Sequence, residues 1–126
     1  MINFSNTTSF DLPSNNHLKK WLKSILLNEG CEEGELNFLF CDDEHLHKLN
    51  LEFLNHDTLT DILTFDYNVG SLVYADICIS IDRVLDNAYV HNVSSENELC
   101  RVMAHGVLHL CGYKDSTSKE KKEMRS

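Results

Sequence analysis

The sequence contains a single proline, Pro13, and only five glycines, and it has neither a low-complexity tract nor an internal repeat. Because proline- and glycine-rich stretches mark the linkers between domains, no linker can be drawn within the chain. Its length of 126 residues agrees, since one domain commonly takes about 100–200 residues. We therefore expect residues 1–126 to fold as one domain in which helices and strands alternate without interruption.

The spacing of apolar residues predicts the order of these elements. A first helix is expected from an N-cap at Ser14 to Asn28, and Gly30 is expected to stop it. Further helices are expected over residues 42–53, 82–90 and 96–111, and strands over residues 35–40, 61–65 and 71–81. The pattern predicts an α+β fold, in which helices cover a mixed four-stranded sheet and a helix near the C-terminus carries an HxxxH motif.

Acidic residues outnumber basic residues by twenty to eleven, which gives a formal net charge of −9 at pH 7. This balance argues against broad, non-specific capture of nucleic acid, because a polyphosphate is bound through clustered Lys and Arg. Any RNA has to be held at a local site. Some basic residues are candidates to guide RNA to such a site, and the alternative is that they are ordinary solvated side chains. They are Lys19, Lys20, Lys23, Lys119, Lys121, Lys122 and Arg125.

The first residues lack the basic and apolar segments of a signal peptide, and no stretch approaches about 18 apolar residues. We therefore expect a soluble, cytoplasmic protein without a membrane partner. The five cysteines show no CxxC spacing, so buried free thiols are expected in preference to disulfides.

Two histidines four residues apart, His105 and His109, lie in the last predicted helix. Side chains at this spacing share one face of a helix, so the two imidazoles can converge on one cation. At about 100° per residue, they fall on the shoulder of the apolar stripe that includes Leu99 and Leu110. A shoulder is neither core nor open solvent, and the floor of a cleft is expected there.

Gly112 is expected to end this helix in a left-handed turn, which brings Asp115 back toward the histidines as a third candidate ligand. Two neutral imidazoles and one carboxylate suit Zn²⁺ and leave a coordination position open for water, as in catalytic zinc sites. As alternatives, an HxxxH motif also occurs by chance on helices, and Asp115 can be an ordinary loop or N-cap residue. Gly106 stands where HExxH metallopeptidases carry their Glu base, which weakens a peptidase interpretation.

The run HGVLHLCGY, which begins at His105, resembles the HGxLHLxGYDH signature of the YbeY family. Residues 49–65 are similar to that family's LNxxYRxxDxxTDVLSF segment, and residues 75–83 to its GDIxIS segment with the Arg that follows. The matched segments run from about residue 36 to residue 124. The resemblance implies a cytoplasmic, single-strand-specific, metal-dependent endoribonuclease acting in rRNA maturation, at the 3′ end of 16S rRNA, and in ribosome quality control.

The resemblance also implies a cofactor and partners. One divalent ion, with Zn²⁺ favoured, would be held by His105, His109 and Asp115. The partners would be single-stranded rRNA and a ribosomal subunit or ribosome-associated proteins. Asp61, which follows Thr60 as in the family's TD pair, and Asp76 are candidates to orient a ligand imidazole or assist water, with turn and cap roles as the alternative. No protein general base is assigned.

Two positions depart from the family pattern. Asp115 stands where the signature has its final His, so the third ligand is expected to be a carboxylate, which relaxes the metal preference toward ions such as Mn²⁺. Leu54 stands where the family has Arg, a natural clamp for a phosphate in the transition state. The alternative function is therefore a ribosome-assembly binding factor with a structural metal and weak or no catalysis. A hydrolase of another substrate, such as an amide, is a third possibility.

Overall fold

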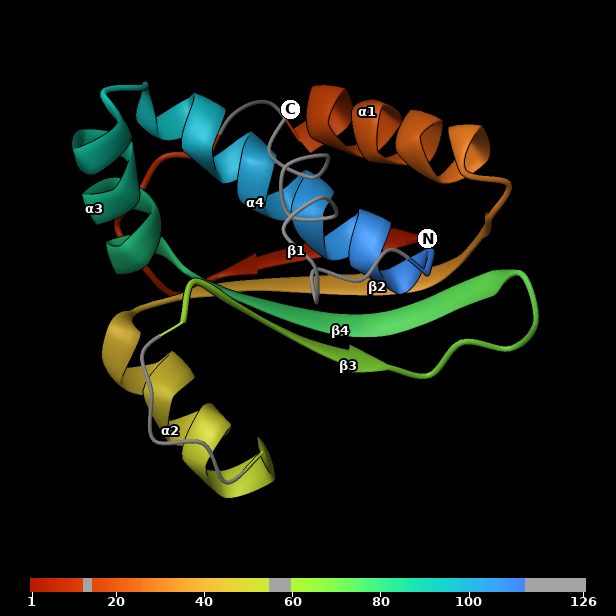
Figure 1. Ribbon diagram of the computed structural model, residues 1–126, viewed down its shortest axis with the longest axis horizontal. Coiled ribbons are helices and arrows are strands. Elements are labelled where there is room, and N and C mark those ends of the chain that lie inside the picture. Colours follow the sequence, from red (N-terminus) through yellow and green to blue (C-terminus); the bar gives the residue numbers. More distant parts are fainter. Residues whose placement is uncertain (13–14, 55–59, 113–126) are drawn as a thin grey trace.

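The computed structural model describes residues 1–12, 15–54 and 60–112 (Figure 1). In this part of the chain the elements are β1 (Ile2–Asn6), α1 (Asn15–Asn28), β2 (Glu32–Cys41), α2 (Asp43–Leu54), β3 (Ile62–Asp66), β4 (Leu72–Ser80), α3 (Ile81–His91) and α4 (Ser95–Leu110). Each expected helix and strand is present, although several ends differ by one or more residues. The N-cap expected at Ser14 lies outside the described residues. No described helix has the length and apolar character that crossing a membrane requires.

The four strands form one mixed sheet in the order β1-β2-β4-β3. Strand β2 pairs in parallel with β1 and with β4, while β3 runs antiparallel to β4. The predicted α+β fold with a mixed four-stranded sheet is thereby confirmed. Strand β1 was missing from the strands that the sequence identified, because Ile2 and Phe4 alone turn toward the core and two apolar residues make a weak alternating pattern.

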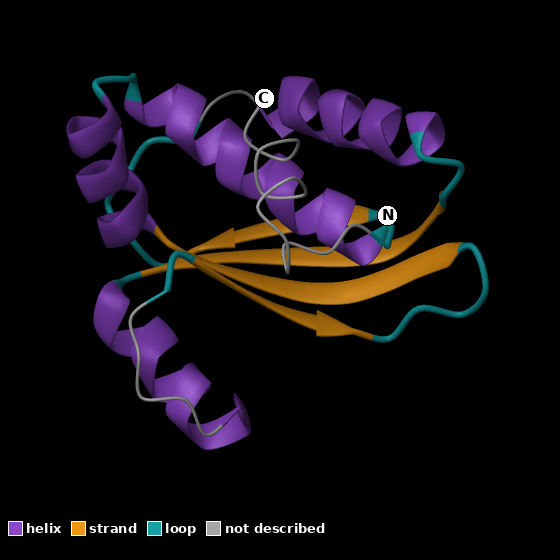
Figure 2. Cartoon of the chain, viewed as in Figure 1, coloured by secondary structure: helices purple, strands orange, loops and turns teal. Residues whose placement is uncertain are grey.

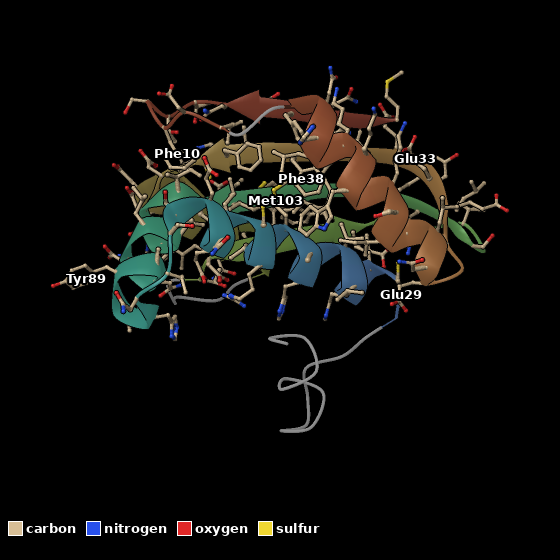
Figure 3. All side chains as sticks on the ribbon, turned by 90° about the horizontal axis from the view of Figure 1, so that it is seen from above. Phe10, Glu29, Glu33, Phe38, Tyr89 and Met103 are labelled. Carbon is tan, nitrogen blue, oxygen red and sulfur yellow. The ribbon has the colours of Figure 1, made fainter. Side chains whose placement is uncertain are left out.

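Helices α1 and α4 lie on one face of the sheet and contact each other (Figures 1 and 2). The main core fills the layer beneath them, and Figure 3 shows Phe38 of β2 and Met103 of α4 near each other at its centre. Leu18, Leu22 and Leu26, which recur at helical spacing on one side of α1, are buried there. This packing fixes both helices against the sheet.

Of the described elements, α2 covers part of the opposite face of the sheet (Figure 2). A smaller core there joins Leu46 of α2 to Cys41, Leu63 and Cys78 of the sheet. The expected absence of disulfides agrees with the structure, in which all five cysteines are free, but only Cys41 and Cys78 are buried.

Polar side chains cross the uncovered part of this face from strand to strand. Asn3 Nδ2 donates to Asn37 Oδ1 at 2.9 Å, and Asn37 Nδ2 donates to Asp76 Oδ1 at 3.1 Å. A groove of about 410 Å³ runs alongside, lined by Asn37 and Asp76 and by aromatic side chains that include Phe53 of α2 and Phe65 of β3. The two faces of the sheet therefore differ in character: one is closed by two helices, and the other is partly polar and open.

The two buried thiols predict how stability depends on pH. Burial raises the pKa of Cys41 from 9.0 to about 12 and that of Cys78 from 9.0 to about 11. In each case the folded-state pKa lies above the unfolded value of 9.0, so ionisation of the thiol is easier in the unfolded chain. The contribution of the thiols to stability is therefore fully present below about pH 9 and is lost as the pH rises through the folded-state pKa values. We predict that the free energy of unfolding, measured in urea, falls between about pH 8.5 and about pH 11, and falls less in Cys41→Ala. An equal fall in both proteins would contradict the assignment.

Candidate metal centre

The start and the buried face of α4 determine how its remaining side chains are presented. Ser94 is the N-cap residue, and its side chain accepts a hydrogen bond from the backbone N–H of Asn97 at 3.1 Å. The predicted apolar stripe is buried against the sheet and comprises Leu99, Val102, Met103, Val107 and Leu110. The predicted helix start and stripe are both confirmed, so the opposite side of α4 points away from the sheet.

His105 and His109 lie one turn apart on α4, at the border of the buried stripe. His105 is half-buried and His109 is exposed, in agreement with the predicted shoulder position. His109 belongs to the last turn of the helix, where the macrodipole carries partial negative charge and favours a cation. The helix thus presents two imidazoles that share one side and can turn toward one ion.

Gly106, between the two histidines, is the point at which α4 approaches the sheet closely. A Cβ atom on this residue would lie 2.7 Å from Ile62 Cδ1 and 3.8 Å from Ile77 Cγ2. Position 106 therefore faces β3 and β4 and not the side that carries the imidazoles. A Glu at this position, as in HExxH, would point into an apolar layer, where a carboxylate is costly. This is a physical reason to set aside the peptidase interpretation.

The end of α4 is a glycine turn, as predicted. The backbone N–H of Cys111 donates to Val107 O at 3.0 Å, and that of Gly112 donates to His109 O at 3.1 Å. Gly112 has a φ of 108°, which favours glycine because it has no Cβ. Asp115 lies outside the described residues, so its place beside the histidines stays a prediction. Within residues 1–12, 15–54 and 60–112, no three His, Cys, Asp or Glu side chains are grouped as metal ligands.

Asn68, in the connection between β3 and β4, ties that connection to the end of α4. Its Nδ2 donates to the backbone carbonyl of Leu110 at 3.0 Å, and its Oδ1 accepts from the backbone N–H of Tyr74 at 3.0 Å. The bond to Leu110 satisfies one of the carbonyls that the end of a helix leaves without an intrahelical partner. No local sequence pattern reveals this contact, because its two residues are 42 positions apart.

A charged cluster lies one turn before His105. Arg101 donates from Nε and Nη2 to the carboxylate of Glu98, which is only 2% exposed, and its Nη2 lies 3.6 Å from Asp61 Oδ2. The hydrogen bond with Glu98 raises the pKa of Arg101 further, so its charge is permanent. Ser94 caps the helix, and the Glu98 side chain pairs with Arg101. Sequence reasoning also missed Arg101, whose spacing to Glu98 is the one local signal that could have identified it.

The two acidic residues singled out from the sequence are on opposite faces of the sheet. Asp61 lies beside α4 through Arg101. Asp76 lies on the other face, hydrogen-bonded to Asn37, whereas its neighbours Ala75 and Ile77 face the core beneath α4. Asp76 therefore cannot orient an imidazole of His105 or His109, and the expectation that it does so is wrong. Successive side chains of a strand point to opposite faces of the sheet, and the motif alone does not reveal which face Asp76 is on.

The Asn68 contacts predict a measurable anchoring of the helix end. In Asn68→Ala, the Leu110 carbonyl and the Tyr74 N–H lose their side-chain partner, so we predict a loss of about 1–2 kcal/mol in the free energy of unfolding. Amide exchange at Cys111 and Gly112 should accelerate beyond the global change. Asn97→Ala, which removes an exposed side chain from α4, is the control and should stay within about 0.5 kcal/mol of wild type. Equal effects of the two substitutions would contradict an anchoring role.

Comparison with known proteins identifies relatives of the whole chain. A family model described as Endoribonuclease YbeY matches residues 2–126. A Flavobacterium johnsoniae protein named Endoribonuclease YbeY is 53% identical over 126 residues, which cover 100% of this chain and 91% of that protein. A Flavobacterium psychrophilum protein of the same name is 47% identical, with 100% and 90% covered.

The fold has a similar match among solved structures. The solution structure of a Thermotoga maritima protein superimposes with a TM-score of 0.67 at 30% identity and covers 99% of this chain and 84% of that one. The family model and the relatives cover the whole of α4, which carries His105 and His109. The chain therefore belongs to the Endoribonuclease YbeY family.

Proposed function

We propose that the protein is a metal-dependent endoribonuclease that cleaves single-stranded RNA, with one Zn²⁺ held by His105, His109 and Asp115. The observation that carries this proposal is the pair of imidazoles one turn apart on the outer side of α4, in a member of the Endoribonuclease YbeY family. The names of the relatives support the endoribonuclease activity. The choice of metal is supported by the ligand atoms on offer, which are imidazole nitrogen and carboxylate oxygen.

The donor set fits a zinc-type ion. Neutral imidazole nitrogen is a preferred zinc ligand, and three protein ligands leave one position for water. A bound Zn²⁺ would supply an activated water and a positive charge beside the scissile phosphodiester. Asp115 is proposed as the third ligand from the sequence alone, and its carboxylate would lower the net charge of the centre relative to a third imidazole.

The residues around the histidines hold the helix that carries them. Gly106 allows α4 to lie close to β3, and Asn68 fixes its last turn. The backbone of His105 and His109 is therefore positioned by the fold before an ion binds. The positive charge of Arg101 is already paired with the carboxylates of Glu98 and Asp61. We therefore propose that Arg101 positions the start of β3 and does not bind a phosphate.

The net charge of −9 restricts how RNA is held. Two lysines of α1 already have partners: the Lys19 ammonium lies 5.7 Å from the centre of the Phe4 ring, and Lys23 Nζ lies 3.7 Å from Glu33 Oε1. The basic residues near the C-terminus lie outside the described part of the chain. We propose that rRNA is presented by a ribosomal subunit or ribosome-associated protein in the cytoplasm, and that the metal centre and a few lysines supply the local affinity.

The ligand assignment predicts the behaviour of two variants. His109→Ala and Asp115→Ala should each lose zinc affinity and cleavage of single-stranded rRNA. Loss of a residue that only hydrogen-bonds to a metal ligand costs about 10–100-fold, and loss of a ligand itself should cost more. Zinc content by mass spectrometry and cleavage of a labelled RNA measure the two effects. His91→Ala, which removes an exposed histidine at the end of α3, is the matched control and should change neither. Full zinc occupancy with unchanged cleavage in both ligand variants would exclude this centre.

The alternative is a ribosome-assembly factor in which the metal is structural and catalysis is weak or absent. It is favoured by one observation: Leu54, the last residue of α2, occupies the position of the family's Arg. An arginine can hold a phosphate through two hydrogen bonds and stabilise charge in the transition state, which leucine cannot do.

The Leu54→Arg variant separates the two functions. If the protein is a nuclease whose RNA lacks a phosphate contact on the α2 side of the sheet, cleavage should increase, by on the order of 10²-fold where the new contact forms in the transition state. Leu51→Arg, at an exposed position one turn earlier on α2, is the control and should leave the rate unchanged. Absence of cleavage in wild type and in Leu54→Arg alike would favour the assembly factor.

A further inference from the structure

One row of side chains crosses the sheet on the face that α2 covers in part, with one member from each strand. Asn37 of β2 lies opposite Asn3 of β1 and Asp76 of β4. Phe65 of β3 lies opposite Asp76 and packs against the smaller core of that face. The row is therefore polar over three strands and ends on an aromatic ring. Helix α4 lies against the other face (Figure 1).

Hydrogen bonds orient the polar members of this row. Asn37 Oδ1 accepts from Asn3 Nδ2 at 2.9 Å, and Asn37 Nδ2 donates to Asp76 Oδ1 at 3.1 Å. Asn37 therefore points its amide oxygen toward β1 and its amide nitrogen toward β4. The second carboxylate oxygen, Asp76 Oδ2, has no hydrogen-bond partner within the described part of the chain. The half-buried Asp76 thus offers one acceptor to the groove that it lines.

Aromatic rings line the same groove of about 410 Å³, which lies within the size range of small-ligand pockets. Phe53 of α2 and Phe65 meet edge to face, with ring centres 5.8 Å apart. Phe53 is 63% exposed, and Tyr67, which follows β3, is 58% exposed. Exposed aromatic faces are platforms on which a flat ring can stack. The groove therefore combines stacking surfaces with a fixed hydrogen-bond acceptor.

The charges of this surface restrict which ligand can enter. An adjoining hollow shares Asn37, Tyr67 and Asp76 with the groove and adds a second carboxylate, Glu35. Among the described residues, no Lys or Arg lines either part. Phosphate groups are therefore repelled from the floor of the groove. An uncharged flat ring that carries a hydrogen-bond donor fits it, with any attached phosphate left outside.

We propose that the groove holds one unpaired base of single-stranded RNA, stacked against its aromatic rings, with an exocyclic amino group of the base donating to Asp76 Oδ2. Cytosine carries such a group at N4, which an Asp carboxylate accepts. Uracil has a carbonyl oxygen at the same position, and the carboxylate repels it. Asp76 is thereby a specificity-determining residue that favours cytosine over uracil.

The proposal rests on the proposed function only in its choice of RNA as the ligand. Ala75 and Ile77, the neighbours of Asp76, face the core beneath α4, so the sheet separates the groove from His105 and His109. The groove would therefore hold a nucleotide that is not the one being cleaved. Its occupation can be measured without metal and without cleavage.

The test measures binding of 2′-O-methyl oligocytidylate and oligouridylate of equal length by fluorescence anisotropy. The full-length protein is kept in EDTA, so that no metal-dependent cleavage takes place. Wild type should bind oligocytidylate about 5–100-fold more tightly than oligouridylate, the range for a specific contact with a base edge.

Asp76→Asn is the decisive variant, because it replaces the acceptor that faces the base and keeps the shape of the side chain. Its Oδ1 can still accept from Asn37, so an N–H donor takes the place of Oδ2, and the preference for oligocytidylate should disappear or reverse. The matched control is Glu52→Gln, which removes an exposed negative charge from α2 and should leave the preference unchanged.

Phe53→Ala tests the stacking surface. It should weaken binding of both oligonucleotides by about 5–100-fold, the effect of removing one stacked aromatic side chain, and should keep the preference for cytosine. Tyr89→Ala, which removes an 88% exposed ring from α3, is its control and should change neither affinity.

Three results would overturn the proposal. The first is equal affinity of wild type for the two oligonucleotides. The second is a preference for oligocytidylate that persists in Asp76→Asn. The third is binding of an arginine-rich peptide, lost in Asp76→Asn, without binding of either oligonucleotide, which would assign the groove to a basic protein. Zinc binding and cleavage enter none of these measurements, so failure of the proposed function is distinguished from failure of this site.

Discussion

The close packing of α4 against β3 and β4 at Gly106 determines how the rest of the candidate centre is arranged. Because a Cβ there would lie 2.7 Å from Ile62 Cδ1, this position has to face the sheet. Once it does, the 100° step of the helix places His105 on the border of the buried stripe, and His109 one turn further on the same side. The shared side of His105 and His109 is therefore a consequence of helix packing, and no loop is needed to bring these two histidines together.

Much of this arrangement could be predicted from local patterns. Helix α4, its cap at Ser94, its glycine stop at Gly112 and the shoulder position of the histidines all follow from spacing along one helix. The contacts that tie α4 to its neighbours could not be predicted in this way. The bond from Asn68 to Leu110 and the approach of Arg101 to Asp61 join residues far apart in sequence, and only the folded chain brings them together.

The two faces of the sheet separate two acidic residues that the sequence treated alike. Asp76 and Asp61 both belong to motifs that resemble the same family, and the sequence offered no reason to separate them. In strand β4, however, Ala75 and Ile77 face the core beneath α4, so Asp76 has to point to the opposite, open face. There it accepts a hydrogen bond from Asn37, on the face away from the histidine helix. The faces therefore divide the motif residues into a group near the candidate centre and a group away from it.

We propose that an ion is bound through the imidazoles of α4. The zinc K-edge X-ray absorption spectrum of zinc-loaded protein tests it most directly, because it reports the ligand atoms themselves. Nitrogen and oxygen ligands are expected at about 2.0–2.1 Å, with imidazole scattering that weakens in His105→Ala. Sulfur ligands at about 2.3 Å would contradict it, because they would place the ion on cysteines and away from His105 and His109.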